Sequence, residues 1–181
     1  MSLEDEYNRL IEIPSDIVNH LPRFVKMVHD LNAQHVIELG TRSGVSTVAW
    51  LYALEKTGGK LTSIDIDPVP PIGDYPHWVF IQSDDLNPDI VASLDSADII
   101  FIDTSHLYEQ TVKELHTYLP LVKNGGVLVL HDTELAMPMG ASFAEPQYPV
   151  KKAVLEFIDE TGFEYVIHED CWGLAIINVV K

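Results

Sequence analysis

Five short apolar segments constrain the fold of this chain more than any other feature. They read H-V-I-E-L (35–39), L-T-S-I-D-I (61–66), W-V-F-I-Q (78–82), D-I-I-F-I-D (98–103) and G-V-L-V-L-H-D (126–132). Within each segment the apolar residues are mostly continuous instead of alternating with polar ones, which is typical of parallel strands covered on both faces of a sheet. The segments therefore predict five parallel strands.

Helical patterns separate most of these strands. They cover residues 46–56, 88–94 and 107–122, whereas the proline-rich stretch 67–76 predicts a loop. Because strands and helices alternate, we expect an α/β fold with a doubly wound sheet and right-handed crossovers.

The end of the chain departs from this alternation. After a helical pattern at 150–161, two strand-like runs at 163–169 and 172–180 are separated by too few residues for a helical crossover. They predict an antiparallel C-terminal hairpin. The complete sheet is therefore expected to have seven strands, mostly parallel and closed by this hairpin.

Residues 14–32 carry apolar positions at helical spacing ahead of the first strand. Ser15 is the expected N-cap of this helix, and Pro22 is expected to kink it or to split it in two. We therefore expect residues 1–33 to form a helical extension. The length of 181 residues fits a single domain spanning residues 1–181.

The net charge restricts the partners of the chain. Eleven Lys and Arg residues against 28 Asp and Glu residues give −17, which repels nucleic acids and anionic membranes and leaves a small molecule as the expected partner. A single cysteine, Cys171, in a strand-like segment predicts a packing role and a reducing compartment. Without a signal-peptide pattern or a long apolar run, the expected location is cytoplasmic. Formation of a homo-oligomer is left open.

The turn after the first strand points to a bound ligand. It reads E-L-G-T-R-S-G (38–44), and its glycines allow the backbone to approach a ligand closely, although a tight turn alone also requires glycine. Asp65 ends the second strand, where it can accept hydrogen bonds from both hydroxyls of a ribose or remain a solvated strand-end residue. Ser83 and Asp84 follow the third strand, where they can meet an adenine amino group.

The chemistry of this turn disfavours a phosphate ligand. There is no G-K-[ST] sequence, and carboxylates surround the glycines. Acidic walls suit a positively charged ligand better than a pyrophosphate. Glu38 is expected either to order the turn or to meet the ammonium group of such a ligand through water.

Two further polar patches end the fourth and fifth strands. D-T-S-H carries Asp103 and His106, and H-D carries His131 and Asp132. Carboxylates with nearby imidazoles can hold Mg²⁺ or another divalent cation, and His106 can serve as a general base. The alternative makes these residues capping or strand-end groups without a chemical role.

Together these segments resemble the class I S-adenosylmethionine-dependent methyltransferases over nearly the whole chain. The resemblance rests on E-L-G-T-R-S-G, I-D-I-D-P, I-Q-S-D, F-I-D-T-S-H, N-G-G-V-L-V-L-H-D and the closing hairpin. It implies a Rossmann-like methyltransferase fold that binds S-adenosylmethionine. The cofactor-binding residues that it implies are Glu38, Gly40, Thr41, Gly44, Ser46, Asp65, Ser83, Asp84 and Asp103. The family often has a glycine where this chain has Arg42.

One branch of that family is similar in more detail. The segments F-I-D-T-S-H-L-Y-E-Q-T-V-K-E-L and L-P-L-V-K-N-G-G-V-L-V-L-H-D look like the metal-dependent sugar and macrolide O-methyltransferases and the cephalosporin hydroxylase-like proteins. This resemblance implies Asp103, His131 and Asp132 as metal ligands, with His106 and Asp103 catalytic. His131 stands where the branch usually has an acid, which favours a softer cation or none.

The expected function is S-adenosylmethionine-dependent O-methylation of a small hydroxylated acceptor, with or without a divalent cation. One alternative is an NAD-dependent oxidoreductase, against which the closing hairpin and the missing G-x-G-x-x-G sequence argue. Another is a cofactor-binding module without transfer activity. The segment 134–149 (with Met137, Met139, Phe143 and Tyr148) is expected to be a substrate lid, a surface excursion or an oligomer contact.

Overall fold

From its first strand onward the chain alternates strands and helices. The computed structural model describes residues 2–69, 72, 75–136 and 147–181. The elements in chain order are α1 (Leu3–Leu10), the 3₁₀ turn η1 (Val18–His20), α2 (Leu21–Leu31), β1 (His35–Leu39), α3 (Val45–Thr57), β2 (Lys60–Asp65), β3 (Trp78–Gln82), α4 (Pro88–Ser93), β4 (Ala97–Ile102), α5 (Tyr108–Tyr118), the 3₁₀ turn η2 (Leu119–Leu121), β5 (Val122–His131), α6 (Pro149–Thr161), β6 (Tyr165–His168) and β7 (Leu174–Asn178).

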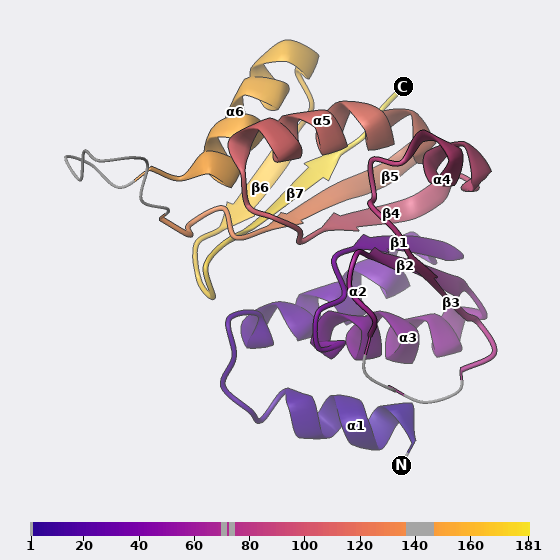
Figure 1. The fold of residues 1–181 in the computed structure, drawn as a ribbon. Helices are drawn as coiled ribbons and strands as arrows, with labels where there is room; N and C mark the ends of the chain where they lie inside the picture. The colour runs from indigo at the N-terminus through magenta and orange to yellow at the C-terminus, as the bar shows by residue number, and fades with distance from the viewer. Residues whose placement is uncertain (1, 70–71, 73–74, 137–146) are drawn as a thin grey trace.

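The strands form one sheet in the order β3-β2-β1-β4-β5-β7-β6 (Figure 1). The first five strands pair in parallel, and β7 runs antiparallel to both β5 and β6. The predicted seven-stranded, doubly wound α/β sheet with its closing hairpin is therefore confirmed. Strand order reverses between β1 and β4, which is the point where open α/β sheets bind ligands at the carboxyl ends of their strands.

Helices cover both faces of the sheet, with α1, α2 and α3 on one side and α5 and α6 on the other (Figure 1). Alternate residues of β1 enter the two cores: Val36 packs on the α2–α3 side, and Ile37 and Leu39 pack on the α5–α6 side. On the first side the rings of Phe24 and Trp50 stack with centroids 4.2 Å apart. Burial on both faces explains why the strands read as continuous apolar runs.

The N-terminal helices differ from the prediction. Helix α1 lies within the expected helical extension, but no pattern predicted its bounds; a Ser2–Asp5 capping box begins it, and Tyr7 stacks on Tyr52 of α3 at 4.5 Å. Ser15 lies outside the helices, so the prediction that it is an N-cap was wrong. Pro22 was expected to kink or split this helical segment, and the structure shows the split: η1 ends at His20, and Pro22 lies in the first turn of α2, where its missing N–H would have no partner.

Helix α5 is shorter than predicted. The pattern at 107–122 predicted a helix up to residue 122, but α5 ends at Tyr118 and η2 follows with Pro120 in it. Proline cannot continue an α-helix, because it lacks the backbone donor and clashes with the preceding turn. Strand β5 consequently begins at Val122, four residues before the predicted strand at 126–132.

Two predicted segments fall partly outside the described residues. Of the proline-rich stretch 67–76, the described residues belong to no helix or strand, as predicted. The predicted lid residues Met137, Met139 and Phe143 lie outside the described residues, whereas Tyr148 is half exposed just before α6. Among the described residues no helix combines the length and apolar character needed to cross a membrane.

A buried carboxylate positions the turn between β1 and α3. Glu38 is 0% exposed and accepts hydrogen bonds from the hydroxyls of Ser46 (2.6 Å), Thr47 (2.8 Å) and Ser63 (2.6 Å). Burial raises the pKa of Glu38 to about 7, although the three donors favour its charged form. Because Ser46 and Thr47 begin α3 and Ser63 lies in β2, Glu38 connects three elements and orders the turn.

The same turn packs tightly against the end of β4. Gly40 has a left-handed backbone (φ +84°), and a Cβ at this position would lie 1.9 Å from the carbonyl oxygen of Asp103. A side chain is therefore excluded by neighbouring backbone as well as by conformation. Gly40 thus has a structural reason to be glycine, independent of any ligand.

We predict that Gly40→Ala lowers the free energy of unfolding by about 3 kcal/mol, because the added methyl group must displace the backbone of Asp103. Gly58→Ala is the matched control, since Gly58 is also left-handed (φ +73°) but has no atom within 4 Å of an added Cβ. The control should lose only about 1 kcal/mol from the backbone conformation. Urea unfolding measures both values, and equal losses in the two variants would contradict the packing argument.

Candidate active site

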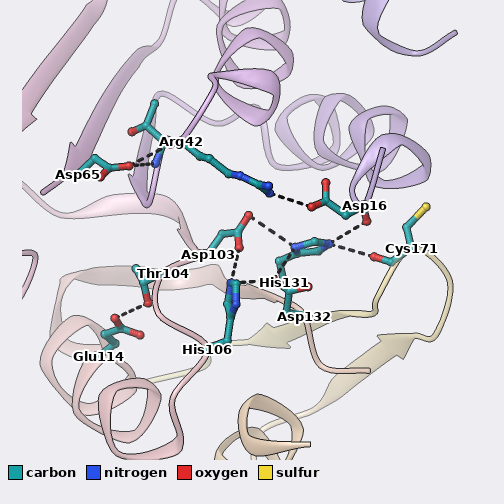
Figure 2. A network of polar contacts seen from close by, with 11 residues as sticks. Asp16, Arg42, Asp65, Asp103, Thr104, His106, Glu114, His131, Asp132 and Cys171 are labelled. Carbon is teal, nitrogen blue, oxygen red and sulfur yellow. Dashed lines mark hydrogen bonds and ion pairs between the residues drawn. The ribbon is translucent and has the colours of Figure 1, made fainter. Parts of the chain in front are cut away.

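Polar side chains gather at the carboxyl ends of the parallel strands (Figure 2). Asp65 ends β2, and His131 ends β5 with Asp132 directly after it. Asp103 follows β4, and Ser83 and Asp84 follow β3. The sheet therefore brings most of the predicted site residues to a single edge. Ser46 and Glu38 also lie near this edge but are hydrogen-bonded to each other at 2.6 Å.

Asp65 holds the glycine turn in this structure. Its Oδ2 accepts hydrogen bonds from the backbone N–H groups of Thr41 (2.7 Å) and Arg42 (2.9 Å), and its Oδ1 accepts one from Asp67 (2.9 Å). Burial would raise the pKa of Asp65, but these backbone donors outweigh it and lower the pKa. The carboxylate is charged at neutral pH, with part of its acceptor capacity already used by the turn.

Two further residues of the turn, Thr41 and Gly44, differ in their surroundings. The hydroxyl of Thr41 is buried and has no hydrogen-bond partner among the residues that the structure describes, which is uncommon for a buried polar group and leaves a donor at the predicted cofactor site. Gly44 begins α3 with φ +80°, and a Cβ there would lie 2.2 Å from Cδ1 of Ile72. Ile72 therefore packs on the bare Cα of Gly44.

Asp84 is exposed, in contrast to its buried neighbour Asp85. The Oδ1 of Asp84 accepts a hydrogen bond from the Leu86 N–H at 2.9 Å, and its backbone carbonyl accepts one from Asn87 at 3.1 Å. Ser83 donates its own N–H to the carbonyl of Asp65 at 2.9 Å. These contacts place Ser83 and Asp84 beside the end of β2, with the Asp84 carboxylate open to solvent.

Two aspartates and two histidines form a cluster at the ends of β4 and β5. The Nε2 atom of His106 lies 3.2 Å from Oδ1 of Asp103 and 2.8 Å from Oδ2 of Asp132. The Nδ1 atom of His131 lies 3.5 Å from Oδ2 of Asp103 and 3.3 Å from Oδ2 of Asp132. One ligand atom each from Asp103, His131 and Asp132 lies within 4.8 Å of the others, a spacing that suits a common metal ion.

Backbone contacts define which nitrogen of His131 carries a proton. Its Nε2 lies 3.2 Å from the carbonyl oxygen of Asp16 and 3.0 Å from that of Cys171. A carbonyl only accepts hydrogen bonds, so Nε2 must be the protonated nitrogen. In the neutral imidazole the lone pair then lies on Nδ1, which faces the two aspartates and is buried without a hydrogen bond of good geometry to any described residue.

The electrostatics of the cluster favour positive charge. Burial lowers the pKa of both histidines, but the neighbouring carboxylates outweigh it and raise the pKa of His131 to about 11 and that of His106 to about 9. Burial likewise raises the pKa of Asp103, but the two imidazoles outweigh it and lower the pKa. The site therefore stabilises a positive charge between its carboxylates, which protons or a bound cation can supply.

Strained backbone accompanies this cluster. His106 (φ 56°), Asp132 (φ 61°), Cys171 (φ 47°) and Trp172 (φ 62°) all adopt the left-handed conformation without being glycine. Such residues cost about 1–2 kcal/mol each and persist where the surrounding structure holds them in place. A cavity of about 10 Å³, large enough for about one water molecule, is lined by Thr104, His106, Thr111 and His131 among apolar side chains.

Sequence reasoning missed the contribution of residues 15–20 and of the β6–β7 turn. Cys171 was predicted to pack within a strand, but it lies in this turn, partly exposed, and it serves His131 through its carbonyl. His20 also contacts that carbonyl (3.3 Å), and Asp16 supplies the second one. Backbone carbonyls leave no signal in a sequence, so no pattern could have identified these contacts.

Comparisons with known proteins show the family of this chain. The family model described as a methyltransferase domain, Methyltransf_24, matches residues 37–133, which run from β1 to just past the end of β5. This match covers more than half of the chain and includes the glycine turn, Asp65, Asp103 and His131. The comparison with curated proteins gives no match.

Solved structures share the fold at low identity. PaMTH1 from Podospora anserina, with bound SAH, is 14% identical with a TM-score of 0.67, and the match covers 98% of this chain and 95% of that chain. The O-methyltransferase TomG from Streptomyces achromogenes, in complex with SAM, is 16% identical with a TM-score of 0.62 (91% and 81% covered).

A third structure contains a metal ion. MycE from the mycinamycin biosynthetic pathway, in complex with Mg, SAH and mycinamycin VI, is 16% identical with a TM-score of 0.67; the match covers 91% of this chain and 49% of MycE. Identities of this size show a shared fold. Together with the family match they confirm the predicted resemblance: the chain belongs to the methyltransferase-domain family and has the fold of S-adenosylmethionine-dependent methyltransferases.

Proposed function

We propose that this methyltransferase moves a methyl group from S-adenosylmethionine to a hydroxyl oxygen of a small acceptor, with a divalent cation held by Asp103, His131 and Asp132. The observation that carries this proposal is the convergence of two carboxylates and the buried Nδ1 of His131 at the ends of β4 and β5. A cation at this point would lie next to the edge formed by β1, β2 and β3, where the cofactor is proposed to bind.

The residues at that edge fit the cofactor. Thr41 has a buried hydroxyl without a partner in the described part of the chain, Asp65 is a charged carboxylate at the end of β2, and Asp84 is exposed beyond β3. Carboxylates around the turn suit a ligand with an ammonium and a sulfonium group. We assign Asp65 to the ribose hydroxyls and Asp84 to the adenine amino group.

The residues at β4 and β5 fit a cation with some affinity for nitrogen. Carboxylate oxygens suit hard cations, whereas an imidazole ligand favours borderline ions such as Fe²⁺ or Zn²⁺; Mn²⁺ is hard but accepts a nitrogen ligand more readily than Mg²⁺. The hydrogen bonds from Nε2 of His131 to two carbonyls orient the ring and leave Nδ1 for the metal, as is usual for histidine ligands. A bound cation would neutralise the two carboxylates that hold the His106 proton and would polarise the acceptor hydroxyl.

The proposed reaction is a displacement at the methyl carbon. The acceptor oxygen forms a bond to the methyl group while the carbon–sulfur bond breaks, so the sulfonium becomes a thioether. The hydroxyl proton passes to Nε2 of His106, which lies 2.8 Å from Asp132 and 3.2 Å from Asp103. The two aspartates then stabilise the resulting imidazolium.

The alternatives have less support. An NAD-dependent oxidoreductase would also need an acid at the end of β2, but the β6–β7 hairpin and the family match favour methyl transfer. A binding module without transfer activity would not require four strained residues around a histidine–aspartate cluster.

We predict that calorimetry detects S-adenosylhomocysteine binding in the micromolar range and detects no binding of NAD. Asp84→Ala should lower the affinity for S-adenosylhomocysteine by about tenfold, because the exposed carboxylate is assigned to the adenine amino group. Asp95→Ala is the matched control, since Asp95 is an exposed carboxylate paired with Lys60 at 2.8 Å, far along the sheet from this edge. Tight NAD binding would contradict the proposal.

We predict that His106→Ala lowers turnover by about a hundredfold, since general-base catalysis contributes roughly this much. The assay is methyl transfer to a panel of catechols, sugars and phenols. His116→Ala is the control, because His116 is an exposed histidine on α5 paired with Glu160 at 3.1 Å. An unchanged rate in His106→Ala would remove His106 from the mechanism, and a panel without any product would favour the binding module.

We predict that the chelator-treated protein binds Mn²⁺ more tightly than Mg²⁺, measured by calorimetry and by the electron paramagnetic resonance signal of free Mn²⁺. Asp103→Asn and Asp132→Asn should each lower the affinity for Mn²⁺ by more than tenfold, because each removes a charged ligand. Asp95→Asn again serves as the control. Mn²⁺ binding that survives both substitutions would show that the cation is held elsewhere.

A further inference from the structure

Arg42 is the one residue of the glycine turn with a long side chain, and it crosses from this turn to another part of the chain. Its backbone is left-handed (φ 48°), and its N–H is held by Asp65 at 2.9 Å. Nη1 of its guanidinium lies 2.9 Å from Oδ2 of Asp16, in the segment before α2 (Figure 2). The family resemblance leads one to expect glycine here, so the side chain calls for an explanation.

The position of Asp16 places this ion pair beside both halves of the site. The carbonyl oxygen of Asp16 contacts Nε2 of His131 at 3.2 Å, while its carboxylate contacts Arg42. In Figure 2 the Arg42 side chain runs from the turn toward Asp16 and passes Asp103. Asp16 therefore connects the guanidinium of the glycine turn with the histidine–aspartate cluster.

The site is rich in acids, so the guanidinium of Arg42 is a group that can bind an anion there. Asp16 contacts the guanidinium and Asp65 accepts the backbone N–H of Arg42, while Asp103 and Asp132 belong to the neighbouring cluster, in a chain with a net charge of −17. These acids suit the ammonium and sulfonium groups of the proposed cofactor, but they repel its carboxylate. Arg42 offers that carboxylate a planar set of N–H donors.

The contact with Asp16 is easily exchanged. The Arg42 side chain is 84% exposed and that of Asp16 is 22% exposed. An ion pair this open to solvent contributes little to stability. A second carboxylate of better geometry can therefore replace Asp16 at the guanidinium without a large cost to the fold.

We propose that Arg42 binds the carboxylate at the amino-acid end of the cofactor and exchanges Asp16 for it. This assignment rests on the proposed function, since it requires an S-adenosyl ligand in the turn. Arg42 is thus a cofactor-binding residue that determines affinity for the amino-acid part of the ligand. The adenosine part is recognised by other residues.

The test compares two ligands that differ in this part. S-adenosylhomocysteine carries the carboxylate, and 5′-methylthioadenosine lacks the whole amino-acid end. Calorimetry with Arg42→Ala should show that the affinity for S-adenosylhomocysteine falls by about tenfold or more and that the affinity for 5′-methylthioadenosine is unchanged. Because alanine keeps the Cβ and the N–H bonded to Asp65, the conformation of the turn is preserved. Asp16→Asn should raise the affinity for S-adenosylhomocysteine by up to about fivefold, since it removes the charge that competes for Arg42.

Lys60→Ala serves as the control for net charge, because Lys60 is an exposed cation paired with Asp95. It should leave both affinities unchanged. If Arg42→Ala lowers the affinity for both ligands equally, Arg42 affects the conformation of the turn instead of binding the carboxylate, and the assignment is wrong. If Arg42→Ala weakens neither, the carboxylate binds elsewhere and the assignment is also wrong. If the wild-type protein binds neither ligand, the proposed function itself fails and this assignment fails with it.

Discussion

The candidate site depends on the two backbone carbonyls that receive the Nε2 proton of His131. One belongs to Asp16 in the segment before α2 and the other to Cys171 in the β6–β7 turn, at 3.2 Å and 3.0 Å. These contacts fix the orientation of the ring and direct Nδ1 toward Asp103 and Asp132. They also connect the two ends of the chain to the carboxyl end of β5, although both lie outside the segment that the family model matches.

The surrounding structure is arranged to keep these carbonyls in place. His20 also contacts the Cys171 carbonyl, and burial lowers the pKa of His20 to about 4, so its ring is neutral. Arg23 contacts Nδ1 of His20 at 2.8 Å, which leaves Nε2 of His20 as the donor to Cys171. The left-handed conformations of Cys171 and Trp172 cost stability. They accompany the turn that directs the Cys171 carbonyl toward His131.

Local patterns were sufficient to predict the sheet. Strands β1 and β3 begin and end at the predicted residues, because continuous apolar runs between turns have few alternatives in a two-sided sheet. The D-T-S-H spacing likewise placed Asp103 and His106 together, since the two residues are close along the chain. The bounds of helix α1 escaped prediction because the helix is short and polar and depends on contacts such as that of Tyr7 with Tyr52. The contributions of Asp16 and Cys171 escaped because both act through their backbone.

Nuclear magnetic resonance of the protein labelled with ¹⁵N-histidine tests the central claim most directly, with diamagnetic Zn²⁺ as the added cation. The signals of His131 are assigned by their loss in His131→Gln. In the Zn²⁺-loaded protein we expect a proton on Nε2 of His131 and none on Nδ1, with the Nδ1 resonance shifted by the metal. A proton on Nδ1 of His131 at saturating Zn²⁺ would contradict the account, because the carbonyls of Asp16 and Cys171 would then not direct this nitrogen to a metal.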